Sequence, residues 1–238
     1  MPPVIIAHRT LPLDASENSL EGIRRSAELR ADYVEIDVRR TRDGVPVLLH
    51  DALLLRTTLR PWPVSWASAR GLRRARLRGS GQPAPTFAEA VDALPPGLGV
   101  AIDTKDPGAA AAIVSELRNQ GKLDRALLWA QSGAAVHWYA KHAGGEAAEV
   151  ALLRDALTPD AIDAFFADAT AFGATAISAH QSTVEPAFIE RAHALGLRVH
   201  CWFQDLTTQA RLAALPLDGI VTDWPVDARA RTSGEDGG

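Results

Sequence analysis

The stretch YVEIDVRRTRDGVPVLLHD, residues 33–51, carries the clearest indication of the fold. Its two halves, Tyr33–Thr41 and Val45–His50, are short runs rich in β-branched residues, which is typical of strands. Only Arg42-Asp43-Gly44 separates them, and this tripeptide is typical of a tight turn. The stretch therefore predicts two strands with no helix between them. They form either a hairpin or a barrel strand that bends and continues into the next one.

Similar runs recur along the chain, and segments with helical spacing fill most of the gaps. The expected strands cover residues 4–9, 33–41, 45–50, 99–105, 126–131, 149–154, 174–180 and 198–204, with a short ninth run at 219–223. The expected helices cover residues 18–29, 86–94, 108–120, 159–172, 184–195 and 207–215. Asn18 and Glu21 have the spacing of a capping box, so Asn18 is the expected cap of the first helix. Strands that alternate with helices pair in parallel through right-handed crossovers. Together with the length of 238 residues and the absence of an internal linker, this favours a single (β/α)8 TIM barrel, an α/β fold, over a doubly wound open sheet.

The pattern predicts one domain over residues 1–228. Residues 51–84 are rich in Pro, Trp and Arg without a clear period, so we expect a small insertion over one barrel end, after the third strand. Residues 70–78 contain five arginines, which indicate either a solvated face or a cationic surface that attracts an anionic substrate to the mouth. Residues 229–238 are polar and glycine-rich, and are expected to form a mobile tail.

Composition narrows the classes of function. The formal net charge of -4 and the sequence pI near 6.0 argue against a general nucleic-acid binder. The single Cys201 cannot form an intrachain disulfide, and the first residues lack the charged and long apolar segments of an export signal, so a cytoplasmic location is expected. No apolar run approaches the roughly 18 residues of a membrane span. The expected partner is a small molecule, and the sequence does not indicate the oligomeric state.

Three carboxylates are expected at the barrel mouth, where the C-terminal ends of the strands meet and active sites of this fold lie. Because neighbouring residues of a strand alternate between its faces, Glu35 and Asp37 share one face. Asp103 lies near the end of the fourth strand. Converging carboxylates repel one another unless a cation is present, and oxygen ligands suit Mg²⁺ or Ca²⁺ better than Zn²⁺. The pattern predicts one divalent cation at these three residues; the alternative is a salt-bridge network with Arg and Lys.

Two histidines, His8 and His50, each end an expected strand. Such a pair can act as general base and general acid near neutral pH, as displacement at phosphorus with an alkoxide leaving group requires. Arg9 and Lys105 add positive charge that can bind phosphate oxygens. His180 ends the seventh strand and is a further candidate for the mouth, whereas the other histidines are expected to be surface or packing residues.

These residues resemble the signature of the glycerophosphodiester phosphodiesterase family. Its opening elements, His-Arg-Gly, Glu-Asn-Thr, Glu-x-Asp-Val, His-Asp and Arg-Thr-Thr, read here as His8-Arg9-Thr10, Glu17-Asn18-Ser19, Glu35-Ile36-Asp37-Val38, His50-Asp51 and Arg56-Thr57-Thr58. Residues 85–89, 196–202 and 218–225 resemble its later elements. The match spans nearly the whole chain and is most specific in the first fifty-eight residues.

The resemblance implies a TIM barrel with contiguous second and third strands and a small insertion after the His-Asp element. It also implies metal-dependent hydrolysis of glycerophosphodiesters to sn-glycerol 3-phosphate and an alcohol. Carried over by position, the resemblance implies that His8 and His50 are the catalytic pair and that Glu35, Asp37 and Asp103 are the ligands of one Mg²⁺ or Ca²⁺ ion. It implies that Arg9 and Lys105 bind the phosphate. It also implies that Glu17 supports the site and that Trp202 lines the pocket for the glycerol or headgroup.

Three departures from the signature leave alternatives open. Thr10 replaces a Gly, Asp103 stands where the family usually has Glu, and Ala130-Gln131-Ser132 replaces a common Ser-Phe. A sphingomyelinase D-like lipid phosphodiesterase keeps the same barrel, but the single cysteine and the lack of an export signal argue against it. A catalytically impaired phosphodiester-binding barrel is opposed by the retained histidines and carboxylates. A Schiff-base aldolase at Lys105 would leave the carboxylates without a purpose.

Overall fold

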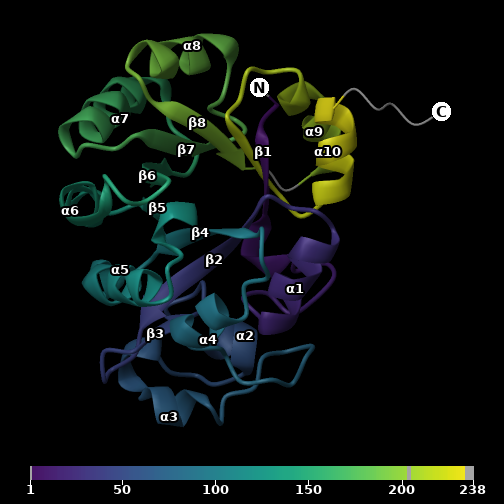
Figure 1. Cartoon of the computed structure of the whole chain (residues 1–238), viewed down its shortest axis with the longest axis vertical. Helices are drawn as coiled ribbons and strands as arrows, with labels where there is room; N and C mark the ends of the chain where they lie inside the picture. Colours follow the sequence, from purple (N-terminus) through teal and green to yellow (C-terminus); the bar gives the residue numbers. More distant parts are fainter. Residues whose placement is uncertain (1, 203–204, 234–238) are drawn as a thin grey trace.

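Eight parallel strands close into a barrel in the computed structural model, which describes residues 2–202 and 205–233 (Figure 1). They are β1 (Val4–Ala7), β2 (Tyr33–Arg40), β4 (Gly99–Thr104), β5 (Ala126–Ala130), β6 (Glu149–Arg154), β7 (Ala176–His180), β8 (Arg198–Trp202) and β9 (Gly219–Thr222). β1 pairs in parallel with both β2 and β9, which closes the ring. The predicted (β/α)8 TIM barrel is confirmed, with the ninth run as its last strand.

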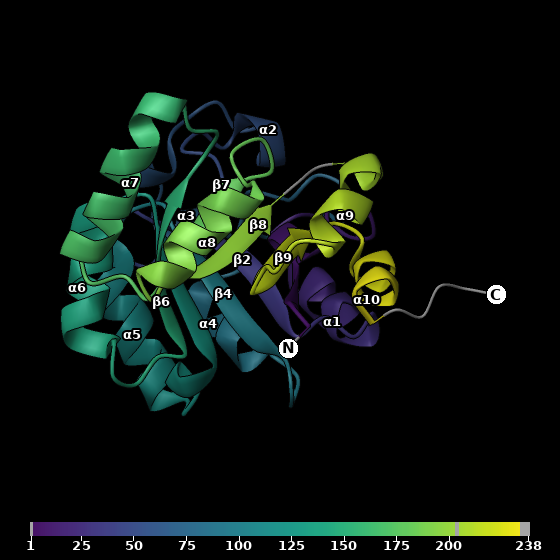
Figure 2. The ribbon, with the colours of Figure 1, turned by 90° about the horizontal axis from the view of Figure 1, so that it is seen from above.

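Helices fill the crossovers and lie outside the strands (Figure 2). They are α1 (Leu20–Glu28), α4 (Phe87–Asp92), α5 (Ala110–Asn119), α6 (Gly133–Ala143), α7 (Pro159–Ala171), α8 (Pro186–Ala194), α9 (Leu206–Ala213) and α10 (Pro225–Ser233), with 3-10 turns η1 (His8–Thr10), η3 (Pro107–Ala109) and η4 (Leu123–Arg125). Across the described ranges, no helix combines the length and apolarity needed to cross a membrane.

The third expected strand is one arm of a hairpin and not a barrel strand. β3 (Pro46–Leu48) pairs antiparallel with the end of β2, with Val38 opposite Leu48. The turn is tight because Thr41 and Val45 are bonded through their backbones and Gly44 adopts φ 85°, in the left-handed region that favours glycine. Of the two arrangements that the sequence allowed, the hairpin is therefore the observed one, and β4 takes the place beside β2 in the barrel.

Strand alternation separates two apolar regions and directs the carboxylates inward. The main core joins outward strand residues such as Val34 and Ile36 to helix residues such as Ile113. A second cluster consists only of strand residues and their neighbours, including Ile6, Leu127 and Trp129, and so fills the barrel interior. Glu35 and Asp37 alternate with the outward residues of β2, which points them to the interior side at the end where the mouth lies.

The insertion at residues 51–84 has its own small core beside β3 and α4. It contains α2 (Leu55–Thr58), η2 (Val64–Trp66) and α3 (Ala69–Leu72). Its buried apolar residues pack together with Val47 and Leu49, which lie in and directly after β3. The residues of the insertion in this cluster are Leu54, Val64, Leu72, Ala75, Leu77 and Ala84. Figure 1 shows α2 and α3 at the lower end of the molecule, beside β3. The insertion is thus packed as a unit rather than as an open loop.

Two boundaries differ from the expectations. α1 is capped by Ser19, whose side chain accepts the Gly22 N–H, so Asn18 is not its cap. α10 extends through Ser233, so residues 229–233 of the expected tail are helical. The side chain of Arg229 fixes this helix by bonding to the Arg30 carbonyl and to Asp32. The end of the expected strand at 203–204 and the remaining tail at 234–238 lie outside the described residues.

Candidate active site

A cavity of about 460 Å³ opens at the C-terminal ends of the barrel strands. Eight of the nine site residues that the resemblance implies line it: His8, Arg9, Glu35, Asp37, His50, Asp103, Lys105 and Trp202. His180, the further candidate for the mouth, is not among the lining residues. Glu17 does not line it but is connected to it through other side chains, as described below. No residue of the insertion at 51–84 is among the lining residues of the cavity.

Three buried carboxylates, Glu35, Asp37 and Asp103, form the floor of the site. One oxygen from each lies within 4.8 Å of the others, and each residue is at most 6% exposed. The Asp103 Oδ1 atom has no hydrogen-bond partner within the described structure although it is fully shielded from solvent. Burial and the negative charge of Asp37 raise the pKa of Glu35 to about 8. A buried acidic cluster with an unpartnered oxygen can hold a cation.

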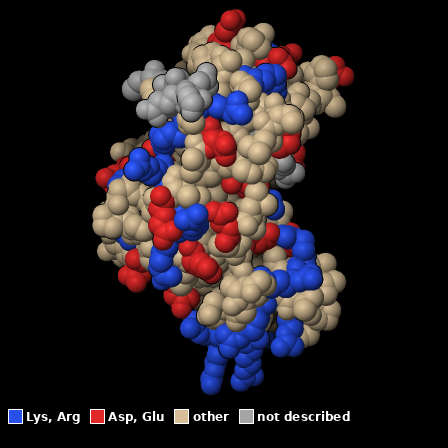
Figure 3. All heavy atoms as spheres, turned by 90° about the vertical axis from the view of Figure 1, so that its right-hand side faces the viewer, with Lys and Arg blue, Asp and Glu red and all other residues tan. Residues whose placement is uncertain are grey.

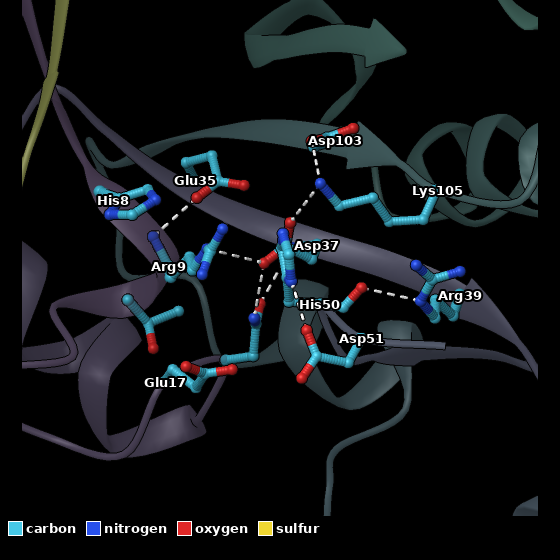
Figure 4. A network of polar contacts seen from close by, with 12 residues as sticks. His8, Arg9, Glu17, Glu35, Asp37, Arg39, His50, Asp51, Asp103 and Lys105 are labelled. Atoms are coloured by element: carbon cyan, nitrogen blue, oxygen red, sulfur yellow. Dashed lines mark hydrogen bonds and ion pairs between the residues drawn. The ribbon is translucent and has the colours of Figure 1, made fainter. Parts of the chain in front are cut away.

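Cationic side chains partly neutralise this cluster. Lys105 Nζ lies 2.5 Å from Asp103 Oδ2 and 3.0 Å from Asp37 Oδ1, and Arg9 Nε lies 3.5 Å from Asp37 Oδ2 (Figure 4). Burial alone would raise the pKa of Asp37, but the charges of Lys105 and Arg9 outweigh it and lower that pKa. The salt bridges expected as the alternative to a metal site are therefore present, but they leave Glu35 with a raised pKa and Asp103 with a free oxygen.

His8 is fixed by an aspartate from the far end of the chain. It begins η1 directly after β1, and its Nδ1 atom lies 2.9 Å from Asp223 Oδ1. Burial alone would lower the pKa of His8, but the hydrogen bond with Asp223 and the charge of Glu35 outweigh it and raise that pKa. With Nδ1 paired to Asp223, the Nε2 atom is the ring nitrogen left to exchange a proton with a substrate.

His50 is fixed by a chain of polar side chains that ends on Glu17, and Figure 4 shows its first contact, between His50 and Asp51. Its Nδ1 atom lies 2.7 Å from Asp51 Oδ1, and Arg56 donates to the other Asp51 oxygen at 2.5 Å. Arg56 also donates two hydrogen bonds of 2.7 Å to Glu17, a bidentate pair. Arg39 donates to the His50 carbonyl. Glu17 is therefore connected to His50 indirectly, through Arg56 and Asp51.

Asn18 belongs to the site, although its sequence position suggested a helix cap. Its Nδ2 donates to Asp37 Oδ2 at 2.8 Å, and its Oδ1 accepts the Asp37 N–H at 2.9 Å. The residue is fully buried and adopts φ 53°, a left-handed conformation that Asn tolerates better than most residues. Asn18 thus fixes the backbone and one oxygen of Asp37 together.

Thr10, which replaces the family's Gly, is accommodated by local hydrogen bonding. Its φ of 59° lies in the left-handed region, where Gly would be unstrained. Its Oγ1 accepts the Ser19 N–H at 3.0 Å, and the residue is fully buried. It packs directly on Gly22, where a Cβ would lie only 2.0 Å from the Thr10 carbonyl oxygen. The loop therefore keeps its close approach to α1 through Gly22.

Aromatic residues also line the cavity, and one of them, Trp129, pairs in register with Asp103 on the neighbouring strand. Trp202, at the end of β8, makes an edge contact with His180, with a ring-centroid distance of 4.5 Å. Trp129 lies deeper and donates its indole N–H to Glu149 at 3.0 Å, and the other Glu149 oxygen lies 2.8 Å from His200 Nε2. His200 is therefore a buried packing residue, as expected, and Trp129 is a lining residue that the sequence reasoning missed.

A parallel barrel whose mouth carries buried carboxylates, two aspartate-bound histidines and flanking cations defines a class of hydrolases that act on phosphodiesters. Within that class, the chain belongs to the glycerophosphoryl diester phosphodiesterase family, whose sequence model matches residues 8–227. As a member, it is an enzyme that hydrolyses glycerophosphodiesters. The resemblance stated from the sequence motifs is confirmed.

A sequence relative agrees with this assignment, and solved structures share the fold. A probable glycerophosphodiester phosphodiesterase 2 from Mycobacterium tuberculosis is 29% identical across 92% of this chain and 87% of its own length. A putative glycerophosphoryl diester phosphodiesterase structure from Agrobacterium tumefaciens is 21% identical, with a TM-score of 0.88 and coverage of 99% of both chains. An Oleispira antarctica phosphodiesterase, solved in complex with the product sn-glycerol-3-phosphate, is 23% identical, with a TM-score of 0.86 and coverage of 98% and 97%.

Proposed function

We propose that the enzyme hydrolyses glycerophosphodiesters to sn-glycerol 3-phosphate and an alcohol, with one divalent cation and with His8 and His50 as general acid and base. The observation that carries the proposal is that two histidines, each bound through Nδ1 to an aspartate, line one cavity with three buried carboxylates. Support for the product comes from the Oleispira antarctica neighbour, whose structure contains sn-glycerol-3-phosphate.

The metal ligands in this proposal are Glu35, Asp37 and Asp103. The residues fit a hard cation because all the donors are carboxylate oxygens and because Asp103 Oδ1 has no partner among the described residues. The ion would be Mg²⁺ or Ca²⁺, and it would supply positive charge against the phosphate oxygens. Asn18 holds Asp37 in the orientation that such a ligand requires.

The other side chains of the site transfer protons, bind the phosphate and contact the rest of the substrate. One histidine removes a proton from the attacking oxygen and the other protonates the departing alkoxide, each through its free Nε2 atom. Arg9 and Lys105 carry fixed positive charge beside the cluster and can bind the non-bridging phosphate oxygens. Trp202 offers an apolar wall to the glycerol or the headgroup.

The product assay tests this function directly. Glycerophosphocholine, glycerophosphoethanolamine and glycerophosphoglycerol are incubated with the enzyme and Mg²⁺ or Ca²⁺, and the products are followed by phosphorus NMR. We expect sn-glycerol 3-phosphate and the free alcohol. Hydrolysis of sphingomyelin or a lysophospholipid with no turnover of the water-soluble diesters would contradict the proposal in favour of a sphingomyelinase D-like enzyme. Binding of the diesters without any turnover would support the impaired barrel instead.

Arg56 is expected to matter for catalysis although it lies outside the cavity. Arg56→Ala removes the donor that holds Asp51 and Glu17, so Asp51 is freer to turn away from His50. Loss of such an outer partner typically reduces activity about 10- to 100-fold, and we expect the loss in kcat rather than in KM. Steady-state kinetics across pH check the prediction.

The matched control is Arg60→Ala, which removes another exposed arginine of the insertion, one that forms no ion pair with a carboxylate of the described residues. Arg56→Lys should recover only part of kcat because an ammonium cannot bond bidentately to Glu17. Equal kcat values and pH profiles for Arg56→Ala and Arg60→Ala would show that the polar chain ending on Glu17 does not support His50.

A further inference from the structure

The insertion at residues 51–84 carries a concentration of unpaired positive charge. It contains seven arginines and one acidic residue, Asp51, and so a net charge of +6 in a chain whose formal net charge is -4. Four of its exposed arginines form no hydrogen bond or ion pair through their side chains with other described residues. These four, which we call the basic surface, are Arg60, Arg70, Arg74 and Arg76. Figure 3 shows Lys and Arg gathered at the lower end of the molecule, where Figure 1 places α3.

The same segment exposes large apolar side chains that its core does not use. Among the described residues, nine large hydrophobic side chains are exposed, and five of them lie in the insertion: Leu53, Leu55, Leu59, Trp62 and Trp66. Trp66 is 70% exposed. The insertion already has a closed core of other apolar residues, so these five are not required to hold it together. Exposed apolar side chains concentrated in one segment mark an interaction surface.

Positive and aromatic side chains meet in one shallow groove of about 280 Å³ on the insertion. Arg60, Trp62 and Arg74 line it, with Gly71 and Leu72 in its wall. The guanidinium carbon of Arg60 lies 5.8 Å from the centroid of the Trp62 ring. A cation and an aromatic ring side by side can contact a phosphate and the adjoining glycerol or acyl region at once.

We propose that the insertion is a peripheral docking surface for a bilayer that contains anionic phospholipids. Arginines near a membrane surface are attracted by anionic headgroups, and Trp and Leu side chains insert at the boundary between headgroups and acyl chains. A nucleic acid would also use the arginines and tryptophans, but it offers no environment for the exposed Leu53, Leu55 and Leu59. The combination of charge and aliphatic exposure therefore favours a lipid surface.

Docking in this way is compatible with an open active site. None of these arginines, leucines and tryptophans lines the catalytic cavity. Among the described residues, the side chains that connect the insertion to His50 and Glu17 are Asp51 and Arg56. Membrane binding would place the enzyme where glycerophosphodiesters are released when phospholipids lose their acyl chains. Membrane docking through the insertion would be the same whichever histidine is the acid and whichever metal ion is bound.

Vesicle co-sedimentation of the full chain tests the docking surface. One set of vesicles contains phosphatidylcholine alone, and the other contains equal parts of phosphatidylcholine and phosphatidylglycerol. We expect binding only to the anionic set, and weaker binding as salt is added. The charge variant Arg70→Glu/Arg74→Glu should bind at least about tenfold more weakly at low salt, and the apolar variant Trp62→Ser/Trp66→Ser should also bind more weakly.

Matched controls lie on α10, away from the insertion: Arg231→Glu reverses one exposed arginine, and Val226→Ser removes an exposed apolar side chain. Both should bind like the wild type, and all variants should hydrolyse a water-soluble diester at the wild-type rate, which shows that they fold. Equal binding to neutral and anionic vesicles, no binding to either, or unchanged binding by the charge variant would each overturn the proposal. Tighter binding to a polyuridine oligonucleotide than to anionic vesicles would assign the surface to nucleic acid.

Discussion

Replacing His8 or His50 by alanine is expected to lower kcat by roughly 10²- to 10⁴-fold, the usual contribution of a positioned proton-transfer group. Each imidazole has one nitrogen bound to an aspartate, Asp223 or Asp51, which leaves the other nitrogen free at the cavity. Alanine removes the proton carrier but keeps the backbone in place, so the effect should fall on turnover. Single-turnover and steady-state kinetics measure it.

The control for both variants is His137→Ala on α6, an exposed histidine outside the cavity. It should retain wild-type kcat. Thermal melting should show that His8→Ala and His50→Ala remain folded, since both side chains contribute polar contacts rather than core packing. If activity fell in proportion to the melting temperature in His8→Ala, His50→Ala and His137→Ala alike, a catalytic role for His8 and His50 would be contradicted.

Leaving-group dependence then separates the two roles. A bis-nitrophenyl or nitrophenyl phosphodiester has a leaving group that departs with little help from an acid. The variant that lacks the general acid should regain most of its activity on such a substrate, and the variant that lacks the general base should not. If His8→Ala and His50→Ala show the same ratio of activities on activated and natural substrates, the paired acid and base assignment fails.

Much of the fold follows from local pattern in the sequence. Strand alternation in residues 33–41 put Glu35 and Asp37 on one face, and the barrel brings that face to Asp103 on the neighbouring strand β4. The tight turn before Val45 was also visible, because it depends on Gly44. The sequence pattern did not decide between a hairpin and a barrel strand that bends and continues. The direction in which two strands pair depends on contacts outside the two strands themselves.

The supporting side chains of the site were harder to predict because their partners are distant in the sequence. His8 and Asp223 are 215 residues apart, and only closure of the barrel brings β9 beside β1. Asn18 has the residue type and spacing of a helix cap, but the chain turns left-handed there and directs its amide to Asp37. Local propensity cannot distinguish these two uses of an asparagine, since both satisfy a backbone N–H.

Removal of divalent ions by a chelator is expected to abolish turnover and to lower the melting temperature. Without an ion, burial and repulsion from Asp37 hold the pKa of Glu35 at about 8, so a proton competes with the metal there. Metal affinity should therefore fall as the pH is lowered below about 8. An ion at 100 times its Kd stabilises the folded state by about 2.7 kcal/mol, which corresponds to roughly 5 to 10 °C for a chain of this size. Activity assays and thermal melts with chelator, Mg²⁺ and Ca²⁺ measure both effects.

Variants of Asp103 determine whether the effect belongs to the carboxylate cluster. Asp103→Ala should lose most of its activity and its metal-dependent stabilisation, whereas Asp103→Glu should keep both, since the family usually has Glu at this position. Asp155→Asn removes another carboxylate that lines the same cavity and should respond to chelator as the wild type does. The protein should stay folded without the ion because Lys105 still bridges Asp37 and Asp103. Full turnover in excess chelator, with metal analysis showing no bound ion, would rule out a metal-dependent mechanism and leave Arg9 and Lys105 as the cations of the site.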